Sequence, residues 1–345
     1  MAKSTQSIYI GTVSGNAVVI KTYWSGSVGG IYALTVGGAN TPFLNQASLK
    51  IAGGTATLST TGTANLDVGT ELEQPDTCLA DCYQTSTLYT SPGLTDTTVG
   101  VVPFKFVASN GAPTGLTNVT PQIANALFGT GNIRLSQFTS ANADEGTTVF
   151  AVGRDPDSGT RITALSETGV GALGNIVQYL PTISGGAVTG TASASLADGT
   201  PGASGESYTY SPAATLYNGI TVPVSYGGYS SGGSLATAMG STTNATTGYS
   251  VTYLSTGDAA TAIGLGAKEL TYNGVLYSAI AVAEGQYTFW GYEHVMYKGT
   301  LDHTTTNVKY PTVQALIANL TSTTATVKLS TMHVSRTGDG ALVGP

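Results

Sequence analysis

Residues 151–160 have the types and the spacing that build an anion-binding site. A short apolar run ends at a glycine and is followed by Arg154 and then by Ser158, Gly159 and Thr160. Because the first turn of a helix has backbone N–H groups without partners, a Ser-Gly-Thr sequence that opens a helix offers donors to a negative charge. The hydroxyl groups of Ser158 and Thr160 add to these donors. Gly159 lets a ligand approach the backbone, and Arg154 could bind it through two N–H groups.

An ordinary helix cap explains part of the same stretch. Asp157 or Ser158 could satisfy the first helical N–H groups, as cap residues usually do. The stretch alone therefore leaves two interpretations open, a capped helix and an anion cradle.

A second Gly/Ser cluster, at residues 24–31, lies at a predicted junction between a strand and a helix. Its backbone N–H groups and the hydroxyls of Ser25 and Ser27 could also face an anion. A flexible turn is the alternative, and it is the more usual role of a single Gly/Ser cluster. Residues 226–234 form a third such turn.

Catalysis is not expected. Ser158 has no assured general base, because His294, His303 and His333 are far away in the sequence and are best explained as structural residues. No cluster of His and Asp offers the ligands that a metal-dependent phosphatase needs, so neither a metal nor another cofactor is predicted.

The two cysteines, Cys78 and Cys82, are four residues apart. A local disulfide in an exported protein is the first interpretation, and two free thiols are the second.

Composition narrows the class of protein. Only 9% of the 345 residues are charged, against roughly 25% in an average soluble domain. The net charge of −7 argues against a nucleic acid partner, which needs a basic face. With 41% hydrophobic residues the chain can build a core, yet no apolar run approaches the roughly 18 residues of a membrane span. The length predicts two lobes.

Strands alternate with helices along the chain, which indicates an α/β fold. Residues 8–23 predict a hairpin, and residues 56–61 a strand. Residues 99–108 form an almost continuous apolar run, which predicts a strand buried on both faces in a parallel sheet covered by helices. A proline in the first turn predicts a helix from 121 to 128 that ends at Gly129. Residues 182–213 are low in complexity and predict a surface excursion.

The order of four motifs resembles the phosphate-binding (PstS-like) periplasmic substrate-binding proteins of ABC transporters. Residues 25–31 resemble the family's Gly-Ser-Ser-Gly-Gly turn, and Ala80-Asp81 resembles its Ser-Asp turn. Residues 154–160 resemble its Arg-x-Asp-x-Ser-Gly-Thr signature, and residues 288–294 resemble the segment that returns to the first lobe. The resemblance covers most of residues 17–300.

The resemblance implies a two-lobed periplasmic-binding-protein-like fold of class II, with each lobe a mixed sheet flanked by helices. Lobe one would comprise 8–102 plus 292–345, and lobe two 103–291. The chain would capture phosphate or a similar small oxyanion between the lobes, without catalysis. It would work with the membrane component of an ABC transporter in a periplasmic or extracellular location. The implied ligand-binding residues are Ser27, Asp81, Arg154, Ser158, Gly159 and Thr160.

Asp81 also implies a selection among anions. A carboxylate can only accept hydrogen bonds, so it favours a ligand that carries its own proton, such as hydrogen phosphate, over sulfate.

The chain departs from the family in three places. The family's first strand and its Thr/Ser turn have no counterpart here, and Cys78 and Cys82, which bracket Asp81, are not expected in the family. The N-terminal residues also have no apolar signal-peptide core, which fits either a trimmed chain or a protein that is not exported by that route. The middle Asp of the signature falls on Pro156, between Asp155 and Asp157, so either one of these two pairs with Arg154 or that arginine is freer than in the family. The absent strand supports an alternative, a surface or filament-forming protein that retains the fold and assembles with itself through an exposed N-terminal sheet edge.

Overall fold

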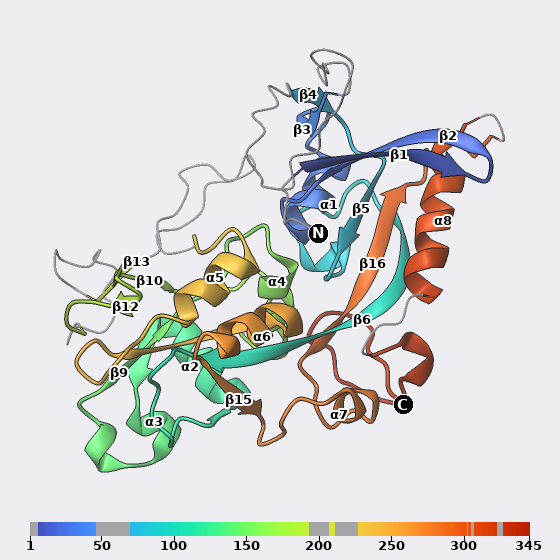
Figure 1. Ribbon diagram of the computed structural model, residues 1–345. Coiled ribbons are helices and arrows are strands. Elements are labelled where there is room, and N and C mark those ends of the chain that lie inside the picture. Colours follow the sequence, from blue (N-terminus) through green and yellow to red (C-terminus); the bar gives the residue numbers. More distant parts are fainter. Residues whose placement is uncertain are drawn as a thin grey trace.

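The computed structural model describes residues 6–45, 70–192, 207–210, 227–301, 303–304, 307–322 and 327–345. The strand predicted at 56–61 and much of the predicted excursion at 182–213 lie outside the described residues. Figure 1 shows a mixed sheet that runs through the molecule with helices on both of its sides, so the predicted α/β class with a mixed sheet flanked by helices is confirmed.

An eight-stranded sheet forms the centre of the fold. Its strands follow the order β5-β16-β6-β14-β9-β8, with β15 paired to β6 and to β7. Their bounds are β5 (Thr77–Ala80), β6 (Leu94–Ala108), β7 (Asn118–Val119), β8 (Asn132–Arg134), β9 (Thr148–Ala151), β14 (Tyr249–Ser255), β15 (Lys268–Tyr272) and β16 (Trp290–Lys298).

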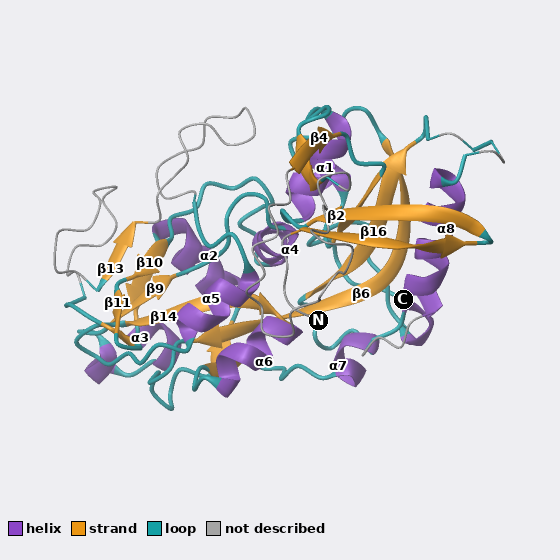
Figure 2. Ribbon diagram, turned by 45° about the horizontal axis from the view of Figure 1, so that its top comes forward, coloured by secondary structure: helices purple, strands orange, loops and turns teal. Residues whose placement is uncertain are grey.

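Helices cover both sides of this sheet. They are α1 (Ser27–Thr35), α2 (Pro121–Thr130), α3 (Ser136–Thr139), α4 (Gly159–Glu167), α5 (Gly232–Met239), α6 (Thr256–Gly264), α7 (Ala279–Ala283) and α8 (Lys309–Ser322). Figure 2 shows α5 and α6 beside the part of the sheet that contains β14, and α8 beside the part that contains β16. Short 3-10 helices occupy Gln84–Ser86, Asn142–Asp144 and Leu329–Thr331.

The long strand β6 joins the two parts of the sheet. From Leu94 to Pro103 it pairs with β16, and from Phe104 to Ala108 it pairs with β14, while β15 pairs with its last residues. Burial of this segment is confirmed, because Phe104, Phe106 and Ala108 are fully buried. The prediction of parallel neighbours is wrong, because β14, β15 and β16 all run antiparallel to β6. Helices cover both faces of this antiparallel segment, so burial on both faces does not require a parallel sheet.

Side chains on the two faces of the β5–β16 part belong to different clusters. Met296 packs with α1 residues such as Ile31 and Leu34. Val295 and Tyr297 pack with Val313 of α8. Successive side chains of β16 point to opposite faces of the sheet, so α1 covers one face and α8 covers the other.

Within the part of the chain that the structure describes, four small antiparallel sheets accompany the central one. Their strands are β1 (Gln6–Val13) with β2 (Asn16–Tyr23), β3 (Thr41–Leu44) with β4 (Thr70–Glu73), β10 (Tyr179–Pro181) with β13 (Tyr208–Tyr210), and β11 (Ile183–Ser184) with β12 (Ala187–Val188). The first is the predicted hairpin, and its two turn residues, Ser14 and Gly15, both have positive φ, as tight hairpin turns require.

Local capping sets the ends of α2. The Thr120 side chain accepts a hydrogen bond from the N–H of Ile123, and Pro121 occupies the first turn, as predicted. The helix ends two residues later than expected. Gly131, not Gly129, adopts the left-handed conformation, with φ of 85°, that closes it.

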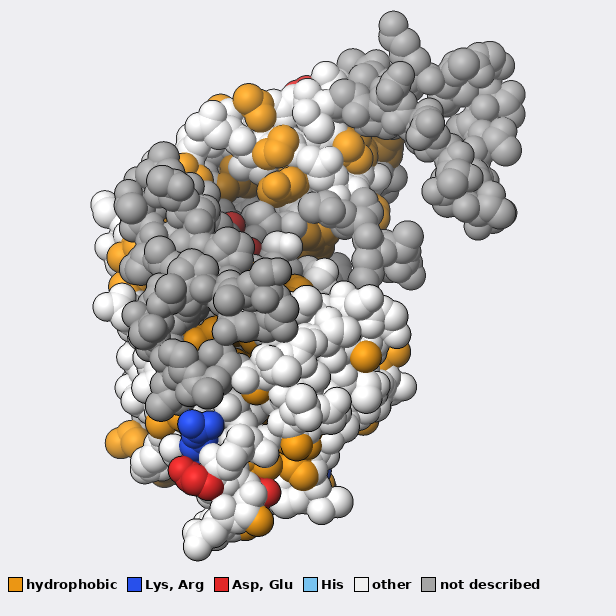
Figure 3. Space-filling view, turned by 90° about the vertical axis from the view of Figure 1, so that its left-hand side faces the viewer, with side chains coloured by type: hydrophobic (Ala, Val, Ile, Leu, Met, Phe, Trp, Pro, Cys, Tyr) orange, Lys and Arg blue, Asp and Glu red, His pale blue; other side chains and the backbone are white. Residues whose placement is uncertain are grey.

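The surface reflects the low charge of the sequence. On the face shown in Figure 3, Lys, Arg, Asp and Glu side chains are sparse among the described residues. Within the described ranges, no helix has the length and apolar character needed to span a bilayer.

Candidate functional site

The first turns of α1 and α4 lie against each other. Strand β2 leads through Gly26 into α1, and β9 leads through residues 152–158 into α4. The N–H of Val28 donates to the carbonyl of Asp157 at 2.9 Å. A Cβ atom at Gly26 would be 2.5 Å from that same carbonyl oxygen, so only glycine permits this approach. Two of the three Gly/Ser motifs in the sequence, at 24–31 and 151–160, thus meet in space.

Asp81, at the end of β5, is the point where both helices converge. The hydroxyl of Ser27 donates to its Oδ1, and the hydroxyl of Thr160 donates to its Oδ2 at 3.0 Å. Its backbone N–H donates to Oγ of Ser27 at 3.2 Å, and its carbonyl accepts from the hydroxyl of Thr163 at 3.0 Å. The structure therefore brings Ser27, Asp81 and Thr160 together.

Gly159 belongs to the same contact. A Cβ atom at this position would be 1.9 Å from Oδ1 of Asp81 and 2.8 Å from Oγ of Ser27. The glycine allows a negatively charged oxygen to reach the first turn of α4. In this structure that oxygen belongs to the Asp81 carboxylate.

Two predicted residues have other partners. Ser158 is the N-cap of α4, with its Oγ accepting from the N–H of Arg161 at 3.2 Å, as the capping interpretation expected. Arg154 donates from Nε to the carbonyl of Tyr229 at 3.0 Å and from Nη2 to that of Ser230 at 3.1 Å. Its guanidinium is therefore bound by the segment that precedes α5, and not by Asp81.

Arg161 is not among the site residues that the sequence predicts. Its side chain is 1% exposed, and Nη1 donates to the carbonyl of Arg154 at 3.0 Å. The amide of Gln178 donates to the same carbonyl at 3.0 Å. These bonds fix the backbone of the loop that enters α4. The only sequence signal for this role is an arginine within the predicted helix, and an arginine is usually exposed to solvent.

Glu293 is the second acidic residue beside Asp81. Strand β16 pairs with β5 so that His294, the residue after Glu293, is opposite Ala80, the residue before Asp81. Burial, and then the charge of Asp81, raise the pKa of Glu293 to about 8. At neutral pH this carboxyl therefore keeps its proton and can donate a hydrogen bond. The sequence signal that could have indicated this residue is a single Glu within the aromatic-rich run 287–297.

The far end of α4 is anchored by a buried ion pair. Nη1 of Arg336 lies 3.1 Å from Oε2 of Glu167, and the two side chains are 1% and 7% exposed. The guanidinium also lies over the Trp290 ring, 4.3 Å from its centroid. The hydroxyl of Thr288 donates to Glu167 as well. Helix α4 is thus held at both of its ends.

The C-terminal segment also reaches the Asp81 side of the site. The N–H of Tyr83 donates to Oδ2 of Asp339 at 2.8 Å. The neighbouring His294 is fully buried, and its Nδ1 lies 2.8 Å from Oδ1 of Asp96. This supports the structural role expected for that histidine. Within the described ranges, no group of three or more His, Cys, Asp and Glu side chains is placed to hold a metal ion.

The local disulfide between Cys78 and Cys82 is not formed, and both thiols are free. Residues 77–80 are extended as β5, and an extended chain rises about 3.3 Å per residue, so Cys78 is carried away from Cys82. Burial is the main cause that raises the pKa of both thiols. The second interpretation, two free thiols, describes the structure.

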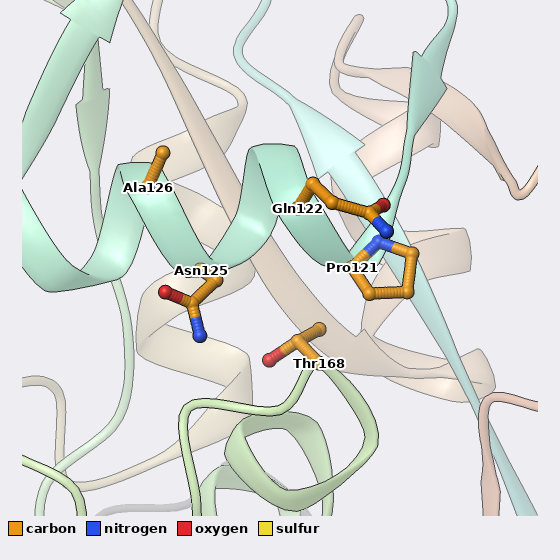
Figure 4. Close-up of a pocket in the computed structure, with 5 residues that line it drawn as sticks. All are labelled: Pro121, Gln122, Asn125, Ala126 and Thr168. Atoms are coloured by element: carbon orange, nitrogen blue, oxygen red, sulfur yellow. The ribbon is translucent and has the colours of Figure 1, made fainter.

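A depression of about 390 Å³ lies away from these residues, at the start of α2 (Figure 4). Figure 4 shows Asn125 of α2 and Thr168, which follows α4, beside each other across it. The residues that line it are Pro121, Gln122, Asn125, Ala126 and Thr168. None of the predicted site residues lines this depression.

No family model and no curated protein matches the sequence. Similar solved structures include an ABC-type phosphate transport receptor from Vibrio cholerae, 16% identical, with 72% of this chain and 74% of that chain covered and a TM-score of 0.41. Another is PstS from Borrelia burgdorferi, 11% identical, with coverage of 72% and 74% and a TM-score of 0.36. A third is a putative phosphate ABC transporter substrate-binding protein with bound phosphate from Clostridium perfringens, 13% identical, with coverage of 69% and 72% and a TM-score of 0.40.

The first and third of these are described as phosphate receptors or substrate-binding proteins of ABC transporters, the family that the sequence motifs resemble. What this chain binds has to follow from its own residues.

Proposed function

We propose that this chain is a solute-binding protein that captures phosphate, or a similar oxyanion carrying a proton, between the first turns of α1 and α4. The observation that carries the proposal is the convergence on Asp81. Hydroxyls from two helices, Ser27 and Thr160, are aimed at one carboxylate, and the lack of a side chain at Gly159 lets that carboxylate approach the first turn of α4.

The chemistry of these groups selects the ligand. Hydroxyls and first-turn N–H groups donate to ligand oxygens, and the Asp81 carboxylate accepts the ligand's own proton. A fully deprotonated anion such as sulfate would repel Asp81. Glu293, neutral below a pKa of about 8, adds no second negative charge at pH 7. The guanidinium of Arg154 would bind the ligand through its positive charge after it releases the carbonyls of Tyr229 and Ser230.

Closure of two lobes around the solute is part of this proposal. Lobe one comprises 8–102 plus 292–345, and lobe two comprises 103–291. The change of partner along β6, from β16 to β14 after Pro103, supports a boundary near this point. The solute is passed without chemical change to the membrane component of an ABC transporter, in a periplasmic or extracellular compartment.

Isothermal titration calorimetry with phosphate and with sulfate tests the proposal. We expect heat with phosphate and much less with sulfate. Thr160→Val removes a hydroxyl bonded to a charged group and should weaken phosphate binding by roughly tenfold to a hundredfold. Thr237→Val is the matched control, because that exposed hydroxyl donates only within α5, to Gly233. Asp81→Asn should reduce the preference for phosphate over sulfate.

Two results would contradict the proposal. One is the absence of phosphate heat from the unmodified protein at pH 6 to 7. The other is phosphate binding that neither Arg154→Ala nor Asp81→Asn changes. Release of phosphate from p-nitrophenyl phosphate would contradict the absence of catalysis.

Self-assembly is the second candidate function, and the β1–β2 ribbon favours it. Tyr9, Ile10, Val19 and Ile20 are 39–70% exposed on this two-stranded sheet. Such apolar strands with few charges can pair with another chain. Regular assemblies of the purified protein in electron micrographs would support this function, and a monodisperse monomer at high concentration would contradict it.

A further inference from the structure

The third Gly/Ser motif of the sequence, described from residue 227 onward, lies against the loop that leads into α4. The N–H of Tyr229 donates to the carbonyl of Gly153 at 3.0 Å, and the N–H of Asp155 donates to the carbonyl of Tyr229 at 3.1 Å. Arg154, between these two loop residues, forms a parallel bridge with Tyr229. Backbone hydrogen bonds therefore join the loop to the segment that precedes α5.

The guanidinium of Arg154 is bound by the same segment. Its Nε donates to the carbonyl of Tyr229 at 3.0 Å, and its Nη2 donates to that of Ser230 at 3.1 Å. Both acceptors are neutral, and an anion is a stronger acceptor for a guanidinium than a neutral carbonyl is. A bound solute can therefore take Arg154 from these carbonyls, but it has to break both hydrogen bonds to do so.

Two buried side chains cross-link the loop and the segment. Nη1 of Arg161 donates to the carbonyl of Arg154 at 3.0 Å and to that of Gly227 at 3.4 Å. The amide of Gln178 donates to the same two carbonyls, at 3.0 Å to that of Arg154. Arg161 and Gln178 are 1% and 0% exposed. Each side chain thus keeps the segment beside the residue whose guanidinium the segment binds.

Gly228 permits the close approach of the two chain segments. Its φ is 139°, and a Cβ atom at this position would be 2.5 Å from the carbonyl oxygen of Arg154 and 2.6 Å from Nε2 of Gln178. A side chain here would push the segment away from the loop. The glycine therefore belongs to the same contact as the two cross-linking side chains.

We propose that residues 227–230 are an autoinhibitory segment, which withholds the guanidinium of Arg154 from the solute site until a solute replaces the two carbonyls that it binds. Arg161 and Gln178 set the strength of this contact, because they tie the segment to the loop that carries Arg154. Loosening the segment therefore increases the affinity for the solute. The inference rests on the proposed function for its ligand, while the contact itself does not depend on phosphate.

Gln178→Met tests the inference. Methionine has a similar size but lacks the amide that donates to the carbonyls of Arg154 and Gly227. We expect phosphate to bind roughly threefold to tenfold more tightly in isothermal titration calorimetry, as the loss of one hydrogen bond in the contact predicts. The gain should disappear when Arg154→Ala is added, because the effect acts through that guanidinium. A purely structural role of Gln178 would not produce tighter binding.

Asn110→Leu is the matched control for Gln178→Met. The amide of Asn110 also donates to two carbonyls, that of Gly240 at 3.1 Å and that of Leu265 at 3.2 Å. These carbonyls follow α5 and α6, so they lie at the opposite end of α5 from the autoinhibitory segment. The substitution should lower the stability of the protein without raising its affinity for phosphate.

Gly228→Ala provides a second variant in case Gln178→Met does not fold. The new Cβ atom would push the segment from the loop, so phosphate should again bind more tightly. Gly111→Ala is its control, because Gly111 has φ of 87° and a Cβ atom there would be 2.3 Å from the carbonyl oxygen of Thr243, in a turn that does not bind Arg154. Circular dichroism confirms that each variant is folded before it is compared.

Labelling with phenylglyoxal, which reacts with accessible guanidinium groups, measures the contact without phosphate. Peptide mass spectrometry should find Arg154 labelled several-fold faster in Gln178→Met than in the unmodified protein. Arg161, which is 1% exposed, serves as the internal reference and should stay unlabelled in both. Equal acceleration at both arginines would show a general loosening and would overturn the specific contact with Arg154.

The outcomes separate this inference from the proposed function. If neither the unmodified protein nor the two variants bind phosphate, the proposed function is wrong, and labelling alone decides whether the segment withholds Arg154. Should Gln178→Met and Gly228→Ala bind phosphate no more tightly than the unmodified protein does, the autoinhibition is overturned even though the function stands. Unchanged labelling of Arg154 in both variants overturns the contact itself.

Discussion

The carboxylate of Asp81 lies against the backbone of Gly159, so closely that a Cβ atom there would be 1.9 Å from Oδ1. Gly159→Ala must therefore push the carboxylate away from the Ser27 and Thr160 hydroxyls. We expect the free energy of unfolding to fall by roughly 1–3 kcal/mol, as for other overpacked sites. Phosphate binding should be lost with it. Denaturant titration and calorimetry measure the two effects.

Gly129→Ala is the matched control for this substitution. Gly129 is also a helical glycine, in α2, but a Cβ atom there would meet nothing within 4 Å. Alanine should raise stability by about 0.5–1 kcal/mol, because glycine loses more conformational freedom on folding. An equal loss of stability at both positions would show that contact with Asp81 is not the cause.

The raised pKa of Glu293 predicts that the stability of the protein depends on pH. Its pKa is raised from 4.5 to about 8 in the folded protein, so the folded state keeps a proton that the unfolded state loses. The free energy of unfolding should therefore fall as the pH rises from about 4.5 to about 8. Glu293→Gln mimics the protonated carboxyl and should flatten this part of the profile. Burial also raises the pKa of Glu167 and Asp339, so the informative quantity is the difference between the two profiles. Parallel profiles would contradict the assignment to Glu293.

Both cysteines should be free and unreactive in the native protein. Cys82 is fully buried, and burial raises the pKa of both thiols, so little thiolate is available for reaction. Ellman's reagent at pH 8 should label almost no thiol in the folded protein and two thiols after denaturation without a reductant. Labelling of none in denaturant would mean that a disulfide links Cys78 and Cys82.

Sequence spacing predicted much of the local geometry of the candidate site, because short motifs determine their own local structure. A glycine-rich run after a strand begins α1, and Ser158 caps α4, so the sequence could place Ser27, Gly159 and Thr160 on helix N-termini. The order of the motifs then suggested that Asp81 joins them. The same local rules gave the β1–β2 hairpin and the start of α2.

The remaining features depend on contacts between distant segments. Arg154 is bound by carbonyls about 75 positions further along the chain, and nothing near it in the sequence indicates that direction. Glu293 approaches Asp81 only because β16 pairs with β5, a register that the sequence does not specify. The antiparallel neighbours of β6 were missed for the same reason, since an apolar run indicates burial but not strand direction.

Removal of the Arg336–Glu167 ion pair should reduce the stability of the protein strongly, although the pair lies away from the proposed ligand site. Both side chains are almost fully buried, and Arg336 also lies over Trp290. Arg336→Ala leaves the Glu167 carboxylate buried without its partner, so the free energy of unfolding should fall by about 3–5 kcal/mol. Lys309→Ala removes an ion pair with Asp76 in which the side chains are 54% and 44% exposed, and it should cost less than about 1 kcal/mol. Similar losses in denaturant titrations of the two variants would contradict the anchoring of α4 by Arg336, because a pair that solvent screens cannot match a buried one.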